Sequence, residues 1–257
     1  LGLTLVILGV SSMIVREVHL HHVYMPLVEP WVTAYGSQDS IESLFVNLRF
    51  DNGEQGWGEC APAPLPLYNS EYTKGAFAAA KDVFGTQIIG KKISSADQLQ
   101  SLFQRFKGHH FTKSAFDSAW WDAHALACSK PLWSVIGGVS QKISVGADIP
   151  VLSSTSALIN RVSEAIDQGF PRVKLKFNRS CTVEMIEQVR SYFPDLVMHI
   201  DCNSGFTLDD IEMFRALDQL ELKMIEQPLA YDDLINHAEL QKQIITPICL
   251  DESITSL

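Results

Sequence analysis

The chain has 257 residues, of which 46% are hydrophobic and 19% are charged. This composition can build a large buried core, either as one large domain or as a small domain followed by a large one. The formal net charge of −10 argues against nucleic acid or an anionic membrane as a partner. The five cysteines form no CxxC pair, which indicates reduced thiols and predicts a cytoplasmic protein.

Residues 1–12 form an apolar segment that lacks a basic start and is too short to span a bilayer. A regular pattern opens at Met13. We therefore expect residues 1–12 to be upstream or artificial sequence rather than a membrane anchor.

The next part of the chain, residues 13–138, has the pattern of an α+β domain. Alternating apolar runs predict an antiparallel meander with strands at 14–24, 43–50 and 56–59. A loop at 29–36 would join the first two strands, and a proline-rich loop at 60–72 would follow the third. Helical periodicity follows at 70–89, 96–107 and 112–129. Pro131 and the pair Gly137-Gly138 then break the chain at the expected domain boundary.

A repeat of 25 residues organises the second domain, residues 139–257. Four short apolar runs end at Lys176, Asp201, Glu226 and Asp251, each 25 residues after the one before. This period fits one strand, one helix and two short loops, which predicts successive βα units of a parallel barrel. One lysine and three carboxylates would then stand at the carboxyl ends of neighbouring strands, where barrel active sites are built.

The other elements of this domain follow from the same pattern. A strand is expected at 143–149. Helices are expected at 153–168, 182–193, 207–217 and 232–244.

The residue types at the strand ends predict a metal site. Three carboxylates that converge repel one another unless a cation lies between them, and hard oxygen ligands favour Mg²⁺, with Mn²⁺ as the alternative. We therefore expect Asp201, Glu226 and Asp251 to bind the metal. Singly, a strand-end aspartate more often caps a helix, but three carboxylates in register favour the metal.

Lys174 and Lys176 lie two residues apart on one strand, so both side chains point to the same side. Partial burial beside a cation disfavours the ammonium form of lysine, which predicts a general base. Asn203 and Glu252 follow two of the carboxylates, and we expect them to hydrogen-bond around the metal ligands.

These strand ends resemble the motifs of the enolase superfamily, muconate-lactonizing-enzyme subgroup. The patterns KxK, DxN, EQP and DES correspond to Lys174-Leu175-Lys176, Asp201-Cys202-Asn203, Glu226-Gln227-Pro228 and Asp251-Glu252-Ser253. Within the subgroup, residues 66–72 and 246–254 most resemble o-succinylbenzoate synthases and N-acylamino acid racemases. The resemblance runs from about residue 13 to the end of the chain.

The resemblance implies an α+β capping domain followed by a TIM-type barrel of the modified (β/α)7β form. It implies abstraction of the proton α to the carboxylate of a small substrate, through an enediolate, with Lys176 as the base and Lys174 beside it. Two loops of the capping domain would close over the barrel mouth, which makes Trp31, Tyr35, Leu67 and Tyr68 candidate substrate contacts. We also expect a homo-oligomer.

The sequence leaves the product open. Loss of water would give o-succinylbenzoate for menaquinone synthesis, whereas reprotonation on the opposite face would racemise an N-acylamino acid. Dipeptide epimerases and muconate cycloisomerases are further relatives, and a non-catalytic module that keeps the carboxylates for structure is the alternative of another class. The segment 178–181 replaces the usual glycine-containing turn, and Asp148 stands where small polar residues are common, so both leave the substrate undefined.

Only about five of the eight strands of a barrel are accounted for. One more period after Asp251 would place the second family lysine near residue 276, about one βα unit further on. We therefore expect the barrel to be truncated at this point and the chain to be part of a longer protein.

Overall fold

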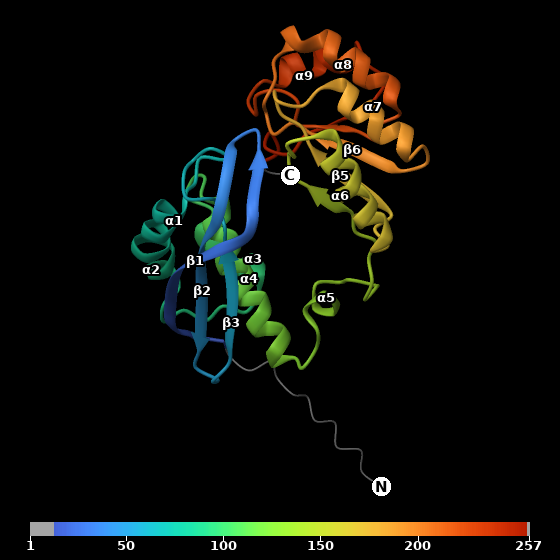
Figure 1. The fold of residues 1–257 in the computed structure, drawn as a ribbon. Coiled ribbons are helices and arrows are strands. Elements are labelled where there is room, and N and C mark those ends of the chain that lie inside the picture. The colour runs from blue at the N-terminus through green and yellow to red at the C-terminus, as the bar shows by residue number, and fades with distance from the viewer. Residues whose placement is uncertain (1–12, 256–257) are drawn as a thin grey trace. The chain divides into compact units, whose positions relative to one another are not determined.

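The computed structural model describes residues 13–255, so the predicted upstream segment 1–12 lies outside the described residues. Two compact units make up the chain (Figure 1). The first contains the residues up to Met25 and the range Ile41–Gln141, and the second contains Pro26–Ser40 and everything from Lys142 onward. Sequence analysis assigned 26–40 to the first domain, whereas this segment groups with the second unit.

The three-stranded sheet has the order β1-β2-β3, as the meander predicted. Its strands are β1 (Val15–Thr33), β2 (Gly36–Phe50) and β3 (Gln55–Cys60). β2 and β3 are antiparallel, with Leu44 opposite Cys60 and Arg49 opposite Gln55.

The loop expected at 29–36 is wrong, because β1 and β2 continue as a long ribbon and turn only at Ala34 and Tyr35. Thr33 Oγ1 accepts a hydrogen bond from the backbone N–H of Tyr35 at 3.1 Å, which closes this turn. Gly36 follows with a φ of 115°, a conformation that favours glycine. The tip of the ribbon, 26–40, belongs to the second unit and bonds there, as shown by the 3.1 Å hydrogen bond from Val151 N to Val32 O.

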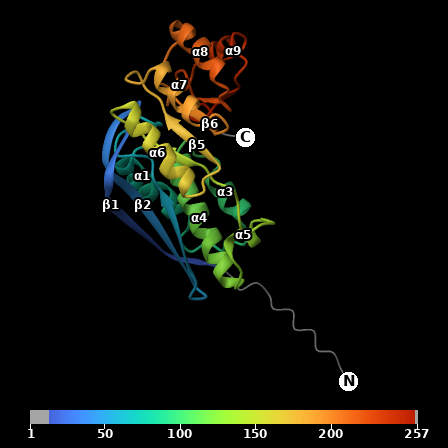
Figure 2. The same cartoon turned by 45° about the vertical axis from the view of Figure 1, so that its right-hand side comes forward.

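The helices of the first unit gather on one face of its sheet (Figure 2). They are α1 (Thr73–Ala79), a π-helical turn (Ala80–Phe84), α2 (Gly85–Ile88), α3 (Ala96–Phe103), α4 (His110–Ala127) and α5 (Leu132–Val135). β3 approaches α4 backbone to backbone, because a Cβ at Gly56 or Gly58 would collide with a carbonyl oxygen of Ala119 or Ala115. The core beside them contains Phe84, Phe103 and Phe116, each less than 3% exposed.

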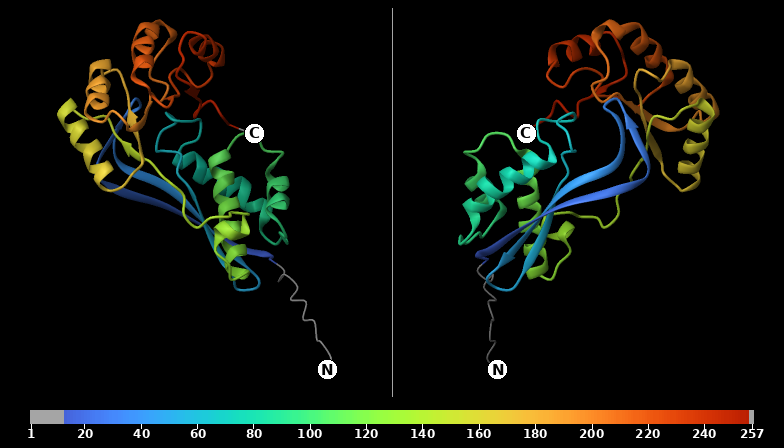
Figure 3. Two further views of the ribbon diagram at one scale, coloured as in Figure 1. Left: turned by 90° about the vertical axis from the view of Figure 1, so that its right-hand side faces the viewer. Right: turned by 60° about the vertical axis from the view of Figure 1, so that its left-hand side comes forward.

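The second unit holds a parallel five-stranded sheet of order β4-β5-β6-β7-β8. The strands are β4 (Ala147–Ile149), β5 (Arg172–Lys176), β6 (Val197–Asp201), β7 (Ile225–Glu226) and β8 (Ile248–Cys249). Each successive pair is joined by helices, which Figure 3 shows along one face of the sheet. These helices are α6 (Thr155–Asp167), α7 (Val183–Tyr192), α8 (Ile211–Leu217) and α9 (Leu234–Gln241), with 3₁₀ turns at Leu208–Asp210 and Asp218–Leu220 on either side of α8.

The predicted fold class is confirmed: an antiparallel sheet with helices is followed by successive βα units of a parallel sheet. A buried apolar cluster separates the strands from their helices, with Val173, Met198, Ile200 and Ile225 fully buried. Among the described residues, no helix is both long enough and apolar enough to cross a membrane.

Candidate active site

The parallel register brings the predicted residues to one edge of the sheet. Lys176 is aligned with Asp201, and Asp201 with Glu226. Glu226 is aligned in turn with Cys249, so Asp251 lies two residues beyond the last paired position of β8. The period of 25 residues therefore marks strand ends correctly for three of the four positions, and the fourth is in the loop that follows.

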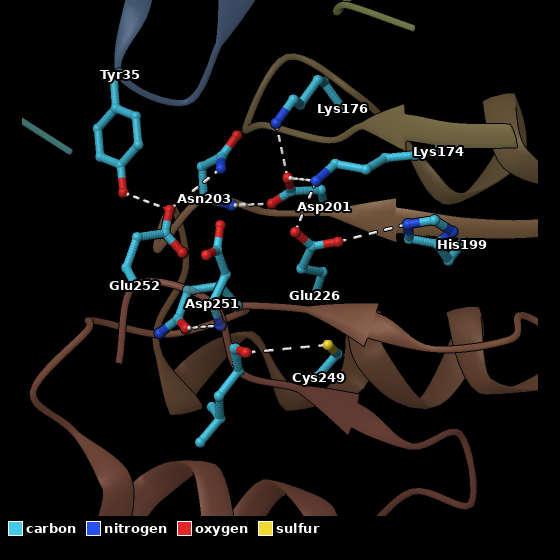
Figure 4. Close-up of polar contacts among 12 residues, drawn as sticks. Tyr35, Lys174, Lys176, His199, Asp201, Asn203, Glu226, Cys249, Asp251 and Glu252 are labelled. Atoms are coloured by element: carbon cyan, nitrogen blue, oxygen red, sulfur yellow. Dashed lines mark hydrogen bonds and ion pairs between the residues drawn. The ribbon is translucent and has the colours of Figure 1, made fainter. Parts of the chain in front are cut away.

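Two ammonium groups lie against the carboxylates at this edge (Figure 4). Lys174 Nζ lies 2.7 Å from Asp201 Oδ2 and 2.6 Å from Glu226 Oε1, and so bridges the two acids. Lys176 Nζ lies 2.7 Å from the same Asp201 oxygen. The other oxygen of Asp201 accepts a hydrogen bond from the backbone N–H of Asn203 at 2.9 Å. Both acids are buried, which strengthens these ion pairs.

The ion pairs set the protonation of the site. Burial disfavours the charged form of Lys174, but its hydrogen bonds to Asp201 and Glu226 outweigh burial and raise its pKa above the ordinary value. For Glu226, burial acts to raise the pKa, but His199 and Lys174 together lower it to about 2. Without a metal ion, the two carboxylates therefore favour the ammonium form of Lys174, whereas the expected effect of a neighbouring metal ion stays a prediction.

His199 is a site residue that sequence analysis missed. It lies on β6 two residues before Asp201, so the alternation of a strand puts both side chains on one side of the sheet. Its ring is buried, and Nε2 lies 3.4 Å from Glu226 Oε2. The alternation of β6 was the signal that could have identified it.

A second polar cluster lies beside the ion pairs (Figure 4). Glu252 Oε1 accepts hydrogen bonds from the hydroxyl of Tyr35 at 2.7 Å and from Asn203 Nδ2 at 3.2 Å. Burial raises the pKa of Glu252, and the bond from Tyr35 opposes that rise. Within the described part of the chain, Asn203 Oδ1 and Glu252 Oε2 are buried oxygens that have no hydrogen-bond donor.

The loops at this edge hold unusual backbone conformations. Asn203, Ser204 and Gln227 have positive φ angles of 42°, 61° and 37°, a region that non-glycine residues rarely adopt. Such conformations persist only where surrounding bonds hold them and are concentrated at functional sites. The EQP motif of the sequence includes one of them, Gln227.

The four predicted substrate contacts divide between the two units. Trp31 and Tyr35 belong to the second unit and are partly buried, and Tyr35 is joined to Glu252 as described. Leu67 and Tyr68 belong to the first unit. Leu67 is 55% exposed, and the ring of Tyr68 packs edge-on against Phe111. Their role in substrate binding stays a prediction.

The oxygen atoms at this edge suit a hard divalent cation by their chemistry. Three carboxylates stand at or just beyond the ends of adjacent strands, and two buried oxygens beside them accept no hydrogen bond. As the side chains stand, however, no group of three or more His, Cys, Asp or Glu within residues 13–255 is arranged to hold a metal ion. Lys174 lies between Asp201 and Glu226, where it neutralises them. By residue type these acids suit the cation, which would compete with Lys174 for Asp201 and Glu226.

Comparison with known proteins agrees with this architecture. Residues 15–137 match the N-terminal domain model of the mandelate racemase / muconate lactonizing enzyme family, and residues 157–257 match the enolase C-terminal domain-like model. The chain is 35% identical over 241 residues to an N-succinylamino acid racemase of Thermus thermophilus, covering 94% of this chain and 65% of that protein. It is also 35% identical over 242 residues to an o-succinylbenzoate synthase of Listeria innocua, with 94% and 65% covered.

The solved structures give the same assignment. A member of the enolase superfamily from Listeria innocua superposes with a TM-score of 0.90 at 35% identity, over 95% of this chain and 66% of that one. The chain belongs to the enolase superfamily, and the two matched domains place it in the mandelate racemase / muconate lactonizing enzyme group. Enzymes of this superfamily generally use Mg²⁺ and act on small carboxylate substrates. The chain spans 65% of the length of each curated relative named above.

Proposed function

We propose that the protein is a Mg²⁺-dependent enzyme that abstracts the proton α to a carboxylate, as an o-succinylbenzoate synthase, an N-acylamino acid racemase or both. The observation that carries the proposal is the pair of lysines on β5 whose ammonium groups meet Asp201 at the carboxyl edge of a parallel sheet. Mn²⁺ is the alternative ion.

The charges at this edge favour a divalent cation together with an anionic substrate. The three proposed ligands, Asp201, Glu226 and Asp251, outnumber the two ammonium groups of Lys174 and Lys176 at this edge. A divalent cation would offset this excess of negative charge and would attract a substrate carboxylate. When bound, Mg²⁺ would polarise the substrate carboxylate and offset the charge that develops as the α-proton leaves.

The lysines would divide the remaining work. Lys176 contacts one carboxylate, whereas Lys174 bridges two, so Lys176 has fewer ion-pair contacts to break before its amino group, once neutral, can accept a proton. We assign the proton transfer to Lys176 Nζ. Lys174 would neutralise Asp201 and Glu226 until the cation binds and would then be free to contact the substrate carboxylate. Asn203 and Glu252 would orient groups around the metal ligands.

The product stays open between elimination of water and racemisation, because relatives at the same identity carry both names. Dipeptide epimerase and muconate cycloisomerase activities are the less favoured alternatives for this protein. Residues 13–138 and 139–257 are proposed as the capping and barrel domains. The homo-oligomer and the cytoplasmic location stay predictions from the sequence.

The test is exchange of the α-proton in deuterated buffer, followed by NMR on N-succinylamino acids, beside an absorbance assay for formation of o-succinylbenzoate. Wild type with Mg²⁺ is expected to be active in at least one assay. Lys176→Ala should lose about 10²- to 10⁴-fold in exchange, the usual contribution of a general base, while Mn²⁺ affinity stays nearly intact. Lys223→Ala, which alters an exposed lysine of the same unit, is the matched control.

A non-catalytic metal-binding module is the competing function. It predicts that the wild type binds Mn²⁺ but exchanges the α-proton of no substrate tested. It also predicts that Lys176→Ala and Lys223→Ala give the same exchange rate and the same Mn²⁺ affinity. Exchange retained in Lys176→Ala would move the base to another residue.

A further inference from the structure

The side chain of Gln227 is fully buried at the carboxyl edge of the barrel sheet, directly after Glu226. All of its hydrogen-bonding capacity is used. Oε1 accepts from the backbone N–H of Asp251 at 2.8 Å and of Ser253 at 3.3 Å. Nε2 donates to the carbonyl of Leu229 at 3.2 Å and to the hydroxyl of Ser253 at 2.8 Å. Because an amide offers two donors and two acceptor sites, these four bonds fix its orientation.

The backbone of Gln227 extends the same connection. Its N–H donates to the carbonyl of Cys249 at 2.8 Å, and its carbonyl accepts from the N–H of Ser204 at 2.8 Å. One residue thus joins the three segments that contain or directly follow the proposed ligands. Ser204 lies three residues after Asp201, Gln227 follows Glu226, and the backbone N–H of Asp251 itself donates to the side chain of Gln227.

Asp251 depends on this bond more than the other two acids do. Asp201 and Glu226 end paired strands, so the β ladder fixes their backbones. Pairing of β8 ends at Cys249, and Asp251 lies beyond it. Besides its bonds to Gln227, the described loop contains a local bond from Ile254 N to Asp251 O at 2.9 Å and the two side-chain bonds to Glu252. The bond from Asp251 N to Gln227 ties the ligand's own backbone to the neighbouring strand end.

We propose that Gln227 is a positioning residue that holds the backbone of Asp251 in register with Asp201 and Glu226, so that three oxygens can converge on one cation. The proposal rests on the metal site of the proposed function. It assigns to the second residue of the EQP motif a role in metal affinity without contact with the metal. Residues that orient metal ligands typically change affinity by about 10- to 100-fold when mutated.

The chain offers a matched control in Gln241. Its Oε1 accepts from the backbone N–H of Ile248 at 2.7 Å, and its Nε2 donates to the carbonyls of Ile244 and Thr246, each at 3.2 Å. Gln241 therefore makes the same kind of bonds as Gln227 but at the start of β8 rather than beyond its end. Gln241→Met removes comparable bonds without touching the loop of Asp251.

The experiment compares wild type, Gln227→Met, Gln241→Met and Asp251→Asn. Hydrogen exchange of the backbone amides over 250–254 is followed without added metal, and Mn²⁺ affinity is measured from the EPR signal of free Mn²⁺. Gln227→Met should exchange these amides at least tenfold faster than wild type and bind Mn²⁺ about 10- to 100-fold more weakly. Gln241→Met should match wild type in both, and Asp251→Asn should lose affinity with the loop still protected.

Equal exchange over 250–254 in wild type and Gln227→Met would overturn the proposal, as would an equal effect of Gln241→Met. Wild-type Mn²⁺ affinity in Gln227→Met would also overturn it. If wild type binds no Mn²⁺, the metal site of the proposed function fails, and the exchange data alone decide whether Gln227 holds the loop.

Two further variants keep the proposal testable if Gln227→Met does not fold. Gln227→Asn shortens the side chain and withdraws the oxygen from Asp251 and Ser253, so it should reproduce the faster exchange if Gln227→Met is unfolded. Gln227→Glu keeps an acceptor at that place and should keep the amides of Asp251 and Ser253 protected. Loss of protection in Gln227→Glu would contradict the role of the acceptor oxygen.

Discussion

The hydroxyl of Tyr35 donates a hydrogen bond of 2.7 Å to Oε1 of Glu252, although 217 residues separate the two in sequence. The bond joins the tip of the β1–β2 ribbon to the loop that carries Asp251. Tyr35 was expected to contact substrate, which stays a prediction, and its hydroxyl contacts a buried carboxyl group next to a proposed ligand.

Tyr35→Phe removes this donor and leaves Glu252 with one fewer partner. Because Asn203 still donates to the same oxygen, we expect a loss of about 1 kcal/mol in the free energy of unfolding, the usual contribution of one hydrogen bond. Urea unfolding measures it. Tyr192→Phe on α7 is the control, since that side chain is exposed and should change stability by less than about 0.5 kcal/mol. Equal losses in the two variants would contradict the prediction.

Lys174→Met tests the bridge between Asp201 and Glu226. Without the ammonium group, two buried carboxylates face each other, and we expect a lower melting temperature in KCl. MgCl₂ at matched ionic strength should then raise the melting temperature more in the variant than in wild type, because the ion binds the folded state and replaces the lost charge. Differential scanning calorimetry provides the measurement. A smaller Mg²⁺ effect in Lys174→Met would show that lysine and ion do not compete for this place.

Glu71 caps a helix from 40 residues away. Its buried carboxylate accepts the backbone N–H groups of Phe111 at 2.7 Å and Thr112 at 3.0 Å, and the hydroxyl of Thr112 at 2.6 Å, at the start of α4. Glu71→Ala leaves these donors unsatisfied, and we expect a loss of about 2 kcal/mol in the free energy of unfolding. Glu54→Ala, at a partly exposed position, serves as the control in chemical denaturation. A loss within about 0.5 kcal/mol for Glu71→Ala would rule out the cap.

Asp218 gives stability a defined pH dependence. Its carboxylate accepts the backbone N–H groups of Ile245 at 3.0 Å and Thr246 at 2.6 Å. Burial acts to raise the pKa of Asp218, but these bonds outweigh it and hold the pKa below its ordinary value. A carboxyl group with a lowered folded pKa contributes stability above its unfolded pKa of about 3.9, and that contribution disappears as pH falls through the folded value.

Asp218→Asn should therefore cost about 1 kcal/mol at pH 7 and progressively less below pH of about 4. Urea unfolding of wild type and variant across this range measures the difference. Asp195→Asn, at an exposed position of the same unit, should show no such trend. A cost for Asp218→Asn that is the same at every pH would contradict the assignment.

The strand ends could be predicted from the sequence because they recur at a fixed interval, and strand alternation placed Lys174 and Lys176 on one side. The ion pairs of Lys174 with two acids could not be predicted from the sequence, since they depend on the register between β5, β6 and β7. Strand alternation could have placed His199 on the same side as Asp201. Its contact with Glu226 and the bonds of Gln227 to Asp251 could not be predicted, because each joins residues of two different strand ends. The ribbon tip was missed because Pro26 and Pro30 suggest a loop, whereas its bonds come from residues more than 100 positions later, such as Val151.

The ribbon tip also bears on how this chain could have been assembled from parts. Because 26–40 groups with the second unit, the backbone passes from one unit to the other after Met25, after Ser40 and after Gln141. A single cut in the gene cannot separate the units cleanly, since a fragment starting at Lys142 would lack Tyr35 and remove one of the two described donors to Glu252. If one unit were replaced by that of a relative, segment 26–40 would have to be replaced or kept separately from the sequence around it. This favours inheritance of the two units together.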